Sequence, residues 1–150
     1  MQNTASVYFE DVEVGQEIPK FVRKTGVMEF NRFAAANEEF VPFHMEDEPA
    51  KPFGVDRLFG MGNLRFLYVH AALVKWLGGL EGEAWIKKVG TQYRGYNLKD
   101  QTLTVWGKVT KKYEQDGLHL VDLEIGVNND NGENQGPGFA TVVLPARHGH

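Results

Sequence analysis

Apolar and polar residues alternate along the second half of the chain, which predicts strands that each bury one face. Asp116-Gly117 separates two of the alternating segments and is a strong signal for a tight hairpin turn. A longer polar stretch at 128–136 is predicted to connect the last two strands. The predicted strands are residues 84–96, 101–113, 118–127 and 138–144, with a further strand near the start of the chain at 21–27.

Residues 63–77 do not alternate; they predict a long helix with apolar side chains on nearly every side. Asn63 is a candidate N-cap, and the Gly78-Gly79 pair is a candidate stop signal. Such a helix has to be covered on most sides by other parts of the protein. A shorter amphipathic helix is predicted at 28–37, followed by a constrained loop rich in Glu, Asp and Pro at 38–53.

One long buried helix followed by antiparallel strands is typical of an α+β domain. A curved antiparallel sheet wrapped around the helix satisfies both patterns. The length of 150 residues fits one domain, and no repeat or linker divides the chain, so residues 1–150 are predicted to form a single domain. The tail from about residue 146 to residue 150 is expected to be flexible.

Composition removes several classes of function. The chain has no cysteine, which excludes disulfides, thiolate metal sites and cysteine nucleophiles. Its net charge is −4, without a block of like charges, so we expect no nucleic-acid partner. The first residues lack the pattern of a signal peptide, and the apolar stretch at 64–77 is too short to span a membrane, so a cytoplasmic location is expected. No histidine pair has ligand spacing outside the C-terminal tail, and no metal site is predicted.

The segment around Pro42 carries the residues most suited to chemistry. Glu39 lies five residues before His44, with Pro42 stiffening the loop between them. A carboxylate and an imidazole that share a water can act as a general acid/base pair. Spacing alone favours a structural interpretation, in which His44 is a hydrogen-bonded loop residue.

Residues 38–46, Glu-Glu-Phe-Val-Pro-Phe-His-Met-Glu, resemble the hydratase signature of the MaoC-like dehydratase family. That signature reads aspartate, any residue, asparagine, proline, an apolar residue, histidine, any residue, and an acid. Glu39 stands at the aspartate, Pro42 at the proline, His44 at the histidine and Glu46 at the final acid. Residues 58–61, Leu-Phe-Gly-Met, are similar to the Ala-His-Gly-Met sequence that starts the family's central helix. The resemblance extends in element order from about residue 8 to residue 144 and implies a hot-dog fold.

The resemblance implies a hydratase or dehydratase, a carbon–oxygen lyase that adds or removes water across the α,β double bond of an acyl-CoA or related acyl thioester. Glu39 and His44 would hold the water, and the backbone N–H of Gly60 would stabilise the negative charge on the thioester oxygen. A side chain at Gly60 would obstruct the substrate, although a simple loop glycine explains the residue equally well. No cofactor is implied beyond coenzyme A as part of the substrate.

The residues expected to contact the substrate surround these positions. For Tyr68, which lies about two turns into the helix, core packing is the commoner role. Arg94, with Lys87 and Lys88, is a candidate for the phosphates of coenzyme A, although solvated charges at a strand edge are the more common explanation. The expected substrate-binding residues are Phe40, Pro42, Phe43, Phe59, Met61, Tyr68 and Arg94.

Three departures from the family pattern indicate an atypical member with an unusual acyl substrate. Glu39 replaces aspartate, Val41 replaces asparagine, and Phe59 replaces histidine. Two alternatives follow: a non-catalytic or partner-dependent acyl-CoA-binding subunit of a heteromeric dehydratase, or an acyl-CoA thioesterase, which the same fold also supports. Hot-dog domains usually pair into one continuous sheet, so a homodimer, a higher homo-oligomer or a heteromer with a paralogue is expected.

Overall fold

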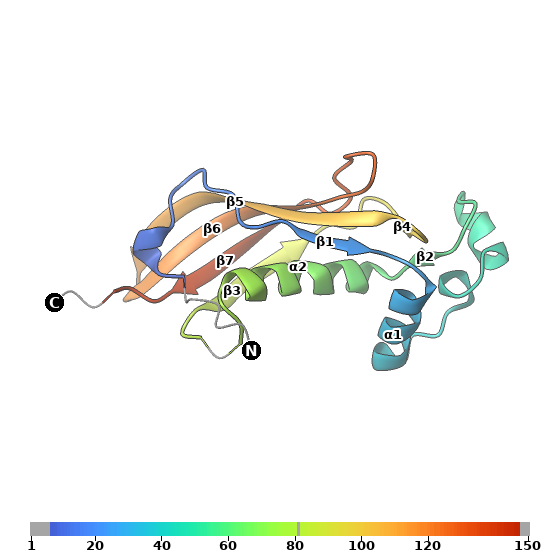
Figure 1. Ribbon diagram of the computed structural model, residues 1–150, viewed down its shortest axis with the longest axis horizontal. Helices are drawn as coiled ribbons and strands as arrows, with labels where there is room; N and C mark the ends of the chain where they lie inside the picture. Colours follow the sequence, from blue (N-terminus) through green and yellow to red (C-terminus); the bar gives the residue numbers. More distant parts are fainter. Residues whose placement is uncertain (1–6, 81, 148–150) are drawn as a thin grey trace.

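A five-stranded antiparallel sheet forms one layer of the protein, and a long helix, α2, lies along one face of it (Figure 1). The computed structural model describes residues 7–80 and 82–147. In spatial order the strands of the sheet are β1 (Phe21–Lys24), β5 (Thr102–Gln115), β6 (Leu118–Asn128), β7 (Gly138–Leu144) and β3 (Trp85–Thr91).

The remaining elements gather mainly at one end of α2, where α1 and two 3-10 turns project from the sheet (Figure 1). Two short strands, β2 (Phe59–Gly60) and β4 (Asn97–Leu98), pair antiparallel beside this region. The helical elements are η1 (Phe9–Asp11), α1 (Val27–Asn37), η2 (Pro42–His44), η3 (Glu48–Phe53) and α2 (Gly62–Trp76).

The core fills the space between α2 and the concave face of the sheet. Alternate residues of β5 are buried, as the period of two along that segment predicts. Val69 and Leu73 of α2 are completely buried against this face. The sheet therefore curls around a buried central helix, which confirms the predicted α+β hot-dog architecture.

The hairpin between β5 and β6 has the backbone expected from its sequence. Asp116 and Gly117 have φ angles of 54° and 75°, and Gln115 pairs with Leu118 across the turn. Positive φ at both central residues is what a type I′ turn requires, and its twist matches the twist of the flanking strands. The two longest strands are therefore joined by the predicted tight turn.

Several predicted boundaries were wrong. The strand predicted at 21–27 ends at Lys24, and Val27 is already the first residue of α1. The strand predicted at 84–96 ends at Thr91. The next residue, Gln92, donates its N–H to Pro137 O, but Pro137 has no N–H and cannot donate a bond back, so the ladder stops here. The N-cap predicted at Asn63 lies instead at Met61, which makes no side-chain cap bond. The Asn63 side chain accepts a hydrogen bond from the Tyr93 hydroxyl at 3.1 Å.

Side-chain contacts hold the projecting segment and the chain end in place. Asp47 accepts hydrogen bonds from the Leu58 backbone N–H and the Lys99 ammonium, both at 2.9 Å. Arg147 donates two bonds to the Asp11 carboxylate, at 2.6 and 2.7 Å. The rest of the tail predicted to be flexible, 148–150, lies outside the described residues.

Within residues 7–80 and 82–147, no helix combines the length and the apolar character needed to cross a bilayer.

Candidate active site

His44 is buried and its imidazole has a fixed orientation. Pro42 begins the 3-10 turn η2, and the backbone N–H of His44 closes it by donating to Val41 O at 2.9 Å. The side chain is 6% exposed, and its Nδ1 lies 2.5 Å from the carbonyl oxygen of Phe59. Because a carbonyl only accepts hydrogen bonds, Nδ1 carries a proton, and the tautomer that this contact favours has Nε2 as its acceptor. The fold thus prepares His44 to receive a proton.

Aromatic rings hold this imidazole on two sides. The ring centroids of Phe43 and Phe59 lie 4.5 and 5.2 Å from that of His44, both in edge-on arrangements. Phe43 and Phe59 also stack on one another at 5.4 Å, and Phe53 contacts both. Edge-on aromatic contacts of this kind favour one ring orientation over others. Phe43 and Phe59 therefore contact the imidazole directly, and Phe53 packs against both of these rings.

His44 lines a cavity of about 400 Å³ at the N-terminal end of α2. Four of the residues predicted for the site share this cavity, namely His44, Phe59, Gly60 and Arg94. Its walls come from η2, β2, the start of α2 and the segment between β3 and β4. The lining residues are His44, Phe59, Gly60, Gly62, Arg65, Tyr93, Arg94, Gly95 and Tyr96.

Packing inside the protein requires glycine at position 60. Gly60 pairs with Asn97 in the short ladder of β2 and β4. A Cβ atom there would lie 2.3 Å from Cε1 of Phe30, which is completely buried in the core. Core packing by itself thus excludes a side chain at position 60. Gly62, the first residue of α2, also lines the cavity, at a helix end where backbone N–H groups lack partners within the helix and the potential is positive.

Glu39 and His44 do not share this cavity. The Glu39 carboxylate is half-buried and accepts a hydrogen bond from Asn37 Nδ2 at 2.9 Å. The left-handed conformation of Glu38, with φ of 55°, ends α1 immediately before Glu39. The structure thus directs this carboxylate toward the end of α1 rather than toward the imidazole.

The other predicted contact residues are distributed over different environments. Phe40 is 66% exposed, and Pro42 is exposed on the 3-10 turn. Met61 is 1% exposed and belongs to the hydrophobic core. Of the predicted apolar contacts, Phe59 alone lines the His44 cavity, and Phe43 contacts the His44 ring.

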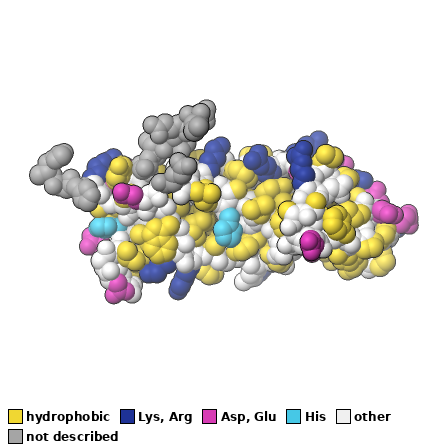
Figure 2. Space-filling view, turned by 90° about the horizontal axis from the view of Figure 1, so that it is seen from below, with side chains coloured by type: hydrophobic (Ala, Val, Ile, Leu, Met, Phe, Trp, Pro, Cys, Tyr) yellow, Lys and Arg dark blue, Asp and Glu magenta, His cyan; other side chains and the backbone are white. Residues whose placement is uncertain are grey.

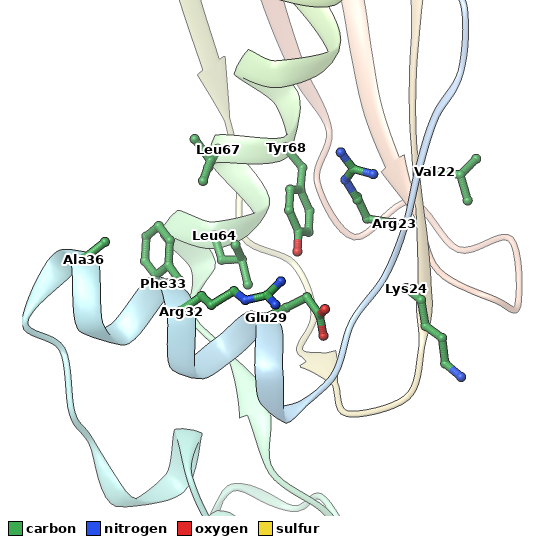
Figure 3. Close-up of a pocket in the computed structure, with 10 residues that line it drawn as sticks. All are labelled: Val22, Arg23, Lys24, Glu29, Arg32, Phe33, Ala36, Leu64, Leu67 and Tyr68. Atoms are coloured by element: carbon green, nitrogen blue, oxygen red, sulfur yellow. The ribbon is translucent and has the colours of Figure 1, made fainter.

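Tyr68 lines a second cavity, of about 640 Å³, between α1, β1 and α2 (Figure 3). Its hydroxyl points toward the side chains of Glu29 and Arg32 (Figure 3). Burial raises the pKa of Tyr68, and the negative charge of Glu29 raises it further, while Arg23 opposes both effects. Tyr68 is therefore a neutral group in a separate cavity. The residues around this second cavity are Val22, Arg23, Lys24, Glu29, Arg32, Phe33, Ala36, Leu64, Leu67 and Tyr68.

Arg65 is a site residue that the sequence did not single out. It is 1% exposed, although it lines the His44 cavity. Its Nη1 donates to the carbonyl oxygen of Gln135 and its Nη2 to that of Gly95, both at 2.9 Å. Burial lowers the pKa of this guanidinium. The available signal was a cation near the start of a largely apolar helix, at a position that the helical pattern buries.

The cavity has cationic and aromatic walls. Arg65 and Arg94 are positively charged, and no carboxylate is among the lining residues. Arg94 lies at the exposed rim, where its Nε donates to Gln92 Oε1 at 2.8 Å. Among the residues that the structure describes, no cluster of His, Asp or Glu side chains is arranged to hold a metal ion. The site offers a fixed imidazole, backbone amides and positive charge.

The chain is similar to solved structures of hydratases and dehydratases. It superposes on the (R)-hydratase PhaJ1 from Pseudomonas aeruginosa with a TM-score of 0.83 and 19% identity, covering 95% of this chain and 88% of that one. The MaoC-like dehydratase from Rhodospirillum rubrum gives a TM-score of 0.78 and 20% identity, with 95% and 99% covered. A chain of the ChsH1–ChsH2 complex from Mycobacterium tuberculosis gives 0.74 and 20%, with 88% and 98% covered.

These similarities are carried by the three-dimensional structure rather than by the sequence. The sequence matches no protein-family model and none of the curated proteins. The resemblance predicted from residues 38–46 and 58–61 is nevertheless confirmed at the level of the fold. The chain has the hot-dog fold of the (R)-hydratase and MaoC-like dehydratase structures that it resembles.

Proposed function

We propose that the protein is a hydratase or dehydratase that acts on an α,β-unsaturated acyl thioester, either an acyl-CoA or a related thioester. The observation that carries this proposal is the buried His44, whose Nδ1 is bound to the Phe59 carbonyl beside a cavity at the start of α2. A neutral imidazole with one fixed nitrogen is suited to general acid/base chemistry near neutral pH. The fold similarity to hydratases supports the same reaction class.

In the proposed hydration, the oxygen of a water bonds to the β-carbon, its proton passes to a base, and a second proton reaches the α-carbon. We assign Glu39 and His44 as the pair that holds the water and exchanges these protons. His44 already lines the cavity. Glu39 has to exchange its hydrogen bond with Asn37 for one with the water before the pair can act. Dehydration reverses the same proton transfers.

Negative charge develops on the thioester oxygen during this reaction and requires donors in the cavity. We assign that role to the backbone N–H of Gly60, which has to leave its ladder pairing with Asn97 to reach the oxygen, together with the N–H of Gly62 at the N-terminus of α2. The unpaired N–H groups of a helix N-terminus add positive potential at the same place. Phe59 and Tyr96, whose ring centroids are 4.4 Å apart, offer an apolar wall for the acyl group.

We propose in addition that two chains pair across α2 and β3. None of the residues that the structure describes covers the face of α2 that carries Leu67, and that side chain is 49% exposed. β3 is an edge strand, and its Trp85 is 47% exposed. Figure 2 shows hydrophobic side chains gathered over the middle of the face on which α2 lies. Pairing would cover this surface and the open strand edge, which a free sheet leaves available for aggregation.

Light scattering of the purified protein tests the pairing. A stable dimer or larger assembly supports it, and a strict monomer with full activity contradicts it. The similarity to a chain of the ChsH1–ChsH2 complex makes a heteromer the second form to test, by co-expression with a related chain.

The reaction is tested with His44→Ala and Glu39→Gln, assayed on a panel of enoyl thioesters by formation of the 3-hydroxyacyl product. Each variant is expected to lower kcat/KM by about 10²- to 10⁴-fold, the usual contribution of a general acid or base. Arg32→Gln, in the second cavity, is the matched control and is expected to retain wild-type turnover. Unchanged turnover in both site variants would refute the assignment.

The same assay separates the alternative functions. Release of free thiol without hydroxyacyl product identifies a thioesterase. Absence of turnover on every thioester, followed by activity when a partner chain is added, identifies a binding subunit.

A further inference from the structure

Arg65 brings a positive charge into the His44 cavity without a carboxylate to balance it. The side chain is 1% exposed, and none of the ion pairs among the described residues includes it. An isolated buried charge is costly unless it is paired and hydrogen-bonded. Within the fold, this charge is stabilised only by the dipoles of backbone carbonyls and by the Tyr93 ring, 5.5 Å away.

Three carboxylates of the segments that precede α2 are engaged elsewhere, and the nearest in the sequence, Asp56, is bonded to Arg57. Glu39 is bonded to Asn37, and Asp47 is bonded to Lys99 and the Leu58 N–H. No acid lines the cavity, while Arg94 adds a second cation at its rim. The local balance of charge in this cavity is therefore positive, which favours an anionic ligand.

The guanidinium of Arg65 is held rigidly and retains unused donors. Its Nη1 and Nη2 each donate to one carbonyl, which leaves each of these nitrogens a second N–H, and its Nε is buried without a partner. The two carbonyls belong to Gly95 and Gln135, which lie on separate loops. A planar guanidinium that is held by two hydrogen bonds and keeps free N–H groups is suited to binding the oxygens of an anion.

We propose that the acyl group of the substrate carries a carboxylate, which binds in the His44 cavity between Arg65 and Arg94. This inference rests on the proposed hydratase function and names its substrate class. The phosphates of coenzyme A share the anionic chemistry, but the whole pantetheine arm separates them from the reacting carbons. Arg65 lines the same cavity as His44, so an anion bound by it belongs to the reacting end of the substrate.

Two substrates with four acyl carbons test the proposal, because crotonyl-CoA ends in a methyl group where fumaryl-CoA has a carboxylate. We expect kcat/KM to be about 10- to 100-fold higher for the fumaryl thioester, as a charge-assisted bidentate contact provides. Arg65→Met should abolish this preference, and Arg65→Lys should restore part of it by keeping the charge without the fork. The control Arg32→Met removes a cation from the second cavity and should leave the ratio unchanged.

The two possible sources of the anion are separated with N-acetylcysteamine thioesters, which contain no phosphate. The preference for the fumaryl group is expected to persist in this pair. If Arg65→Met lowers kcat/KM equally for both coenzyme A esters and for neither N-acetylcysteamine ester, the phosphates are the ligand and the proposal is wrong.

Binding of the saturated pair, butyryl and succinyl thioesters, is measured by titration calorimetry, because these compounds cannot be hydrated. Tighter binding of the succinyl thioester supports the anion site even if no thioester is turned over, which distinguishes failure of this proposal from failure of the proposed reaction. Arg94→Gln, at the exposed rim, gives a second variant that does not depend on the fold tolerating a change at Arg65. The proposal is overturned if the Arg65 and Arg94 variants lose the same factor in binding or in kcat/KM for both members of each pair. Such a result would mean that these residues contact the thioester or serve packing.

Discussion

The two cavities beside α2 differ in a way that size does not reveal. The second cavity, with Tyr68, is the larger, at about 640 Å³ against about 400 Å³ for the His44 cavity. Its cations are accompanied by the carboxylate of Glu29. The smaller cavity has a buried histidine with a fixed proton and a buried arginine without a counter-charge. Polar groups whose burial and orientation are fixed by the fold therefore indicate a reactive site better than volume does.

The two cavities also differ in what builds them. The larger one lies between three regular elements, α1, β1 and α2. The smaller one combines η2, β2, the first residues of α2 and the segment at 92–96, which are irregular or very short. Reactive groups are commonly placed on loops that a rigid scaffold positions, and here the scaffold is the sheet with α2. This contrast can be tested from either side.

The largest difference is expected when each cavity is filled in turn. Gly62→Leu places a side chain in the His44 cavity, where the half-exposed Tyr93 ring, 2.9 Å from the added Cβ, has to move aside. Ala36→Leu fills the second cavity by a similar volume. We expect Gly62→Leu to lower kcat/KM by about 100-fold, since displacement of a substrate by about 1 Å costs that much. Ala36→Leu should remain close to wild type. Both are measured with melting temperatures alongside.

The reverse result would assign the substrate to the second cavity. A large loss in Ala36→Leu with little change in Gly62→Leu would place the substrate between α1 and α2, next to Tyr68. The sequence-based assignment of Tyr68 as a substrate contact would then be supported, and the assignment of His44 would fail.

A smaller effect, on stability, is expected at Gly60, which lines the His44 cavity. Gly60→Ala puts a methyl group 2.3 Å from Cε1 and 2.7 Å from Cδ1 of the buried Phe30 ring. Overpacking of a filled core costs about 1–3 kcal/mol, which denaturant unfolding measures directly. Gly82→Ala, whose added Cβ has no neighbour closer than 3.7 Å, is the control and should change stability by less than about 0.5 kcal/mol.

The double variant Gly60→Ala, Phe30→Leu sharpens this result. If the methyl group and the ring compete for one space, the double variant should lose less than the sum of the two single losses. Strict additivity would show that the glycine is required for another reason, such as the approach of the substrate.

The scaffold was predictable because its signals are local. The alternation of Leu103, Val105 and Val109 with polar residues determines which face of β5 is buried, and Asp116-Gly117 determines the turn. The all-round apolar pattern of α2 predicted its burial correctly for most of its surface. Leu67 is the exception within this chain, and it marks the face that we propose is covered by a second chain.

The site was less predictable because its geometry depends on distant segments. The spacing of Glu39 and His44 suggested a pair, but the left-handed backbone at Glu38 and the bond to Asn37 direct the carboxylate elsewhere. Arg65 was visible only as a cation in an apolar helix. Its significance comes from carbonyls at positions 95 and 135, which no periodicity brings together.

The smallest expected effect concerns how the segment that carries His44 is attached. Asp47 lies between η2 and η3, and its carboxylate accepts bonds from the Leu58 N–H and from Lys99. These bonds, the Leu58 N–H first, lower the pKa of Asp47 in the folded protein. The stabilisation is therefore fully present above the unfolded pKa of about 3.9 and is lost as the pH falls through the lower, folded value.

Asp47→Asn keeps an acceptor for Leu58 and removes only the charge, so it should lower the free energy of unfolding at pH 7. The difference from the wild type should shrink as the pH falls below about 4, where the wild-type carboxylate also becomes neutral. Urea unfolding from pH 7 to pH 3 measures both quantities, with Asp116→Asn in the exposed β5–β6 turn as the control. A difference that stays constant over this range would show that the shape of Asp47, rather than its charge, holds the projecting segment against β4. The His44 cavity would then owe its position to packing alone.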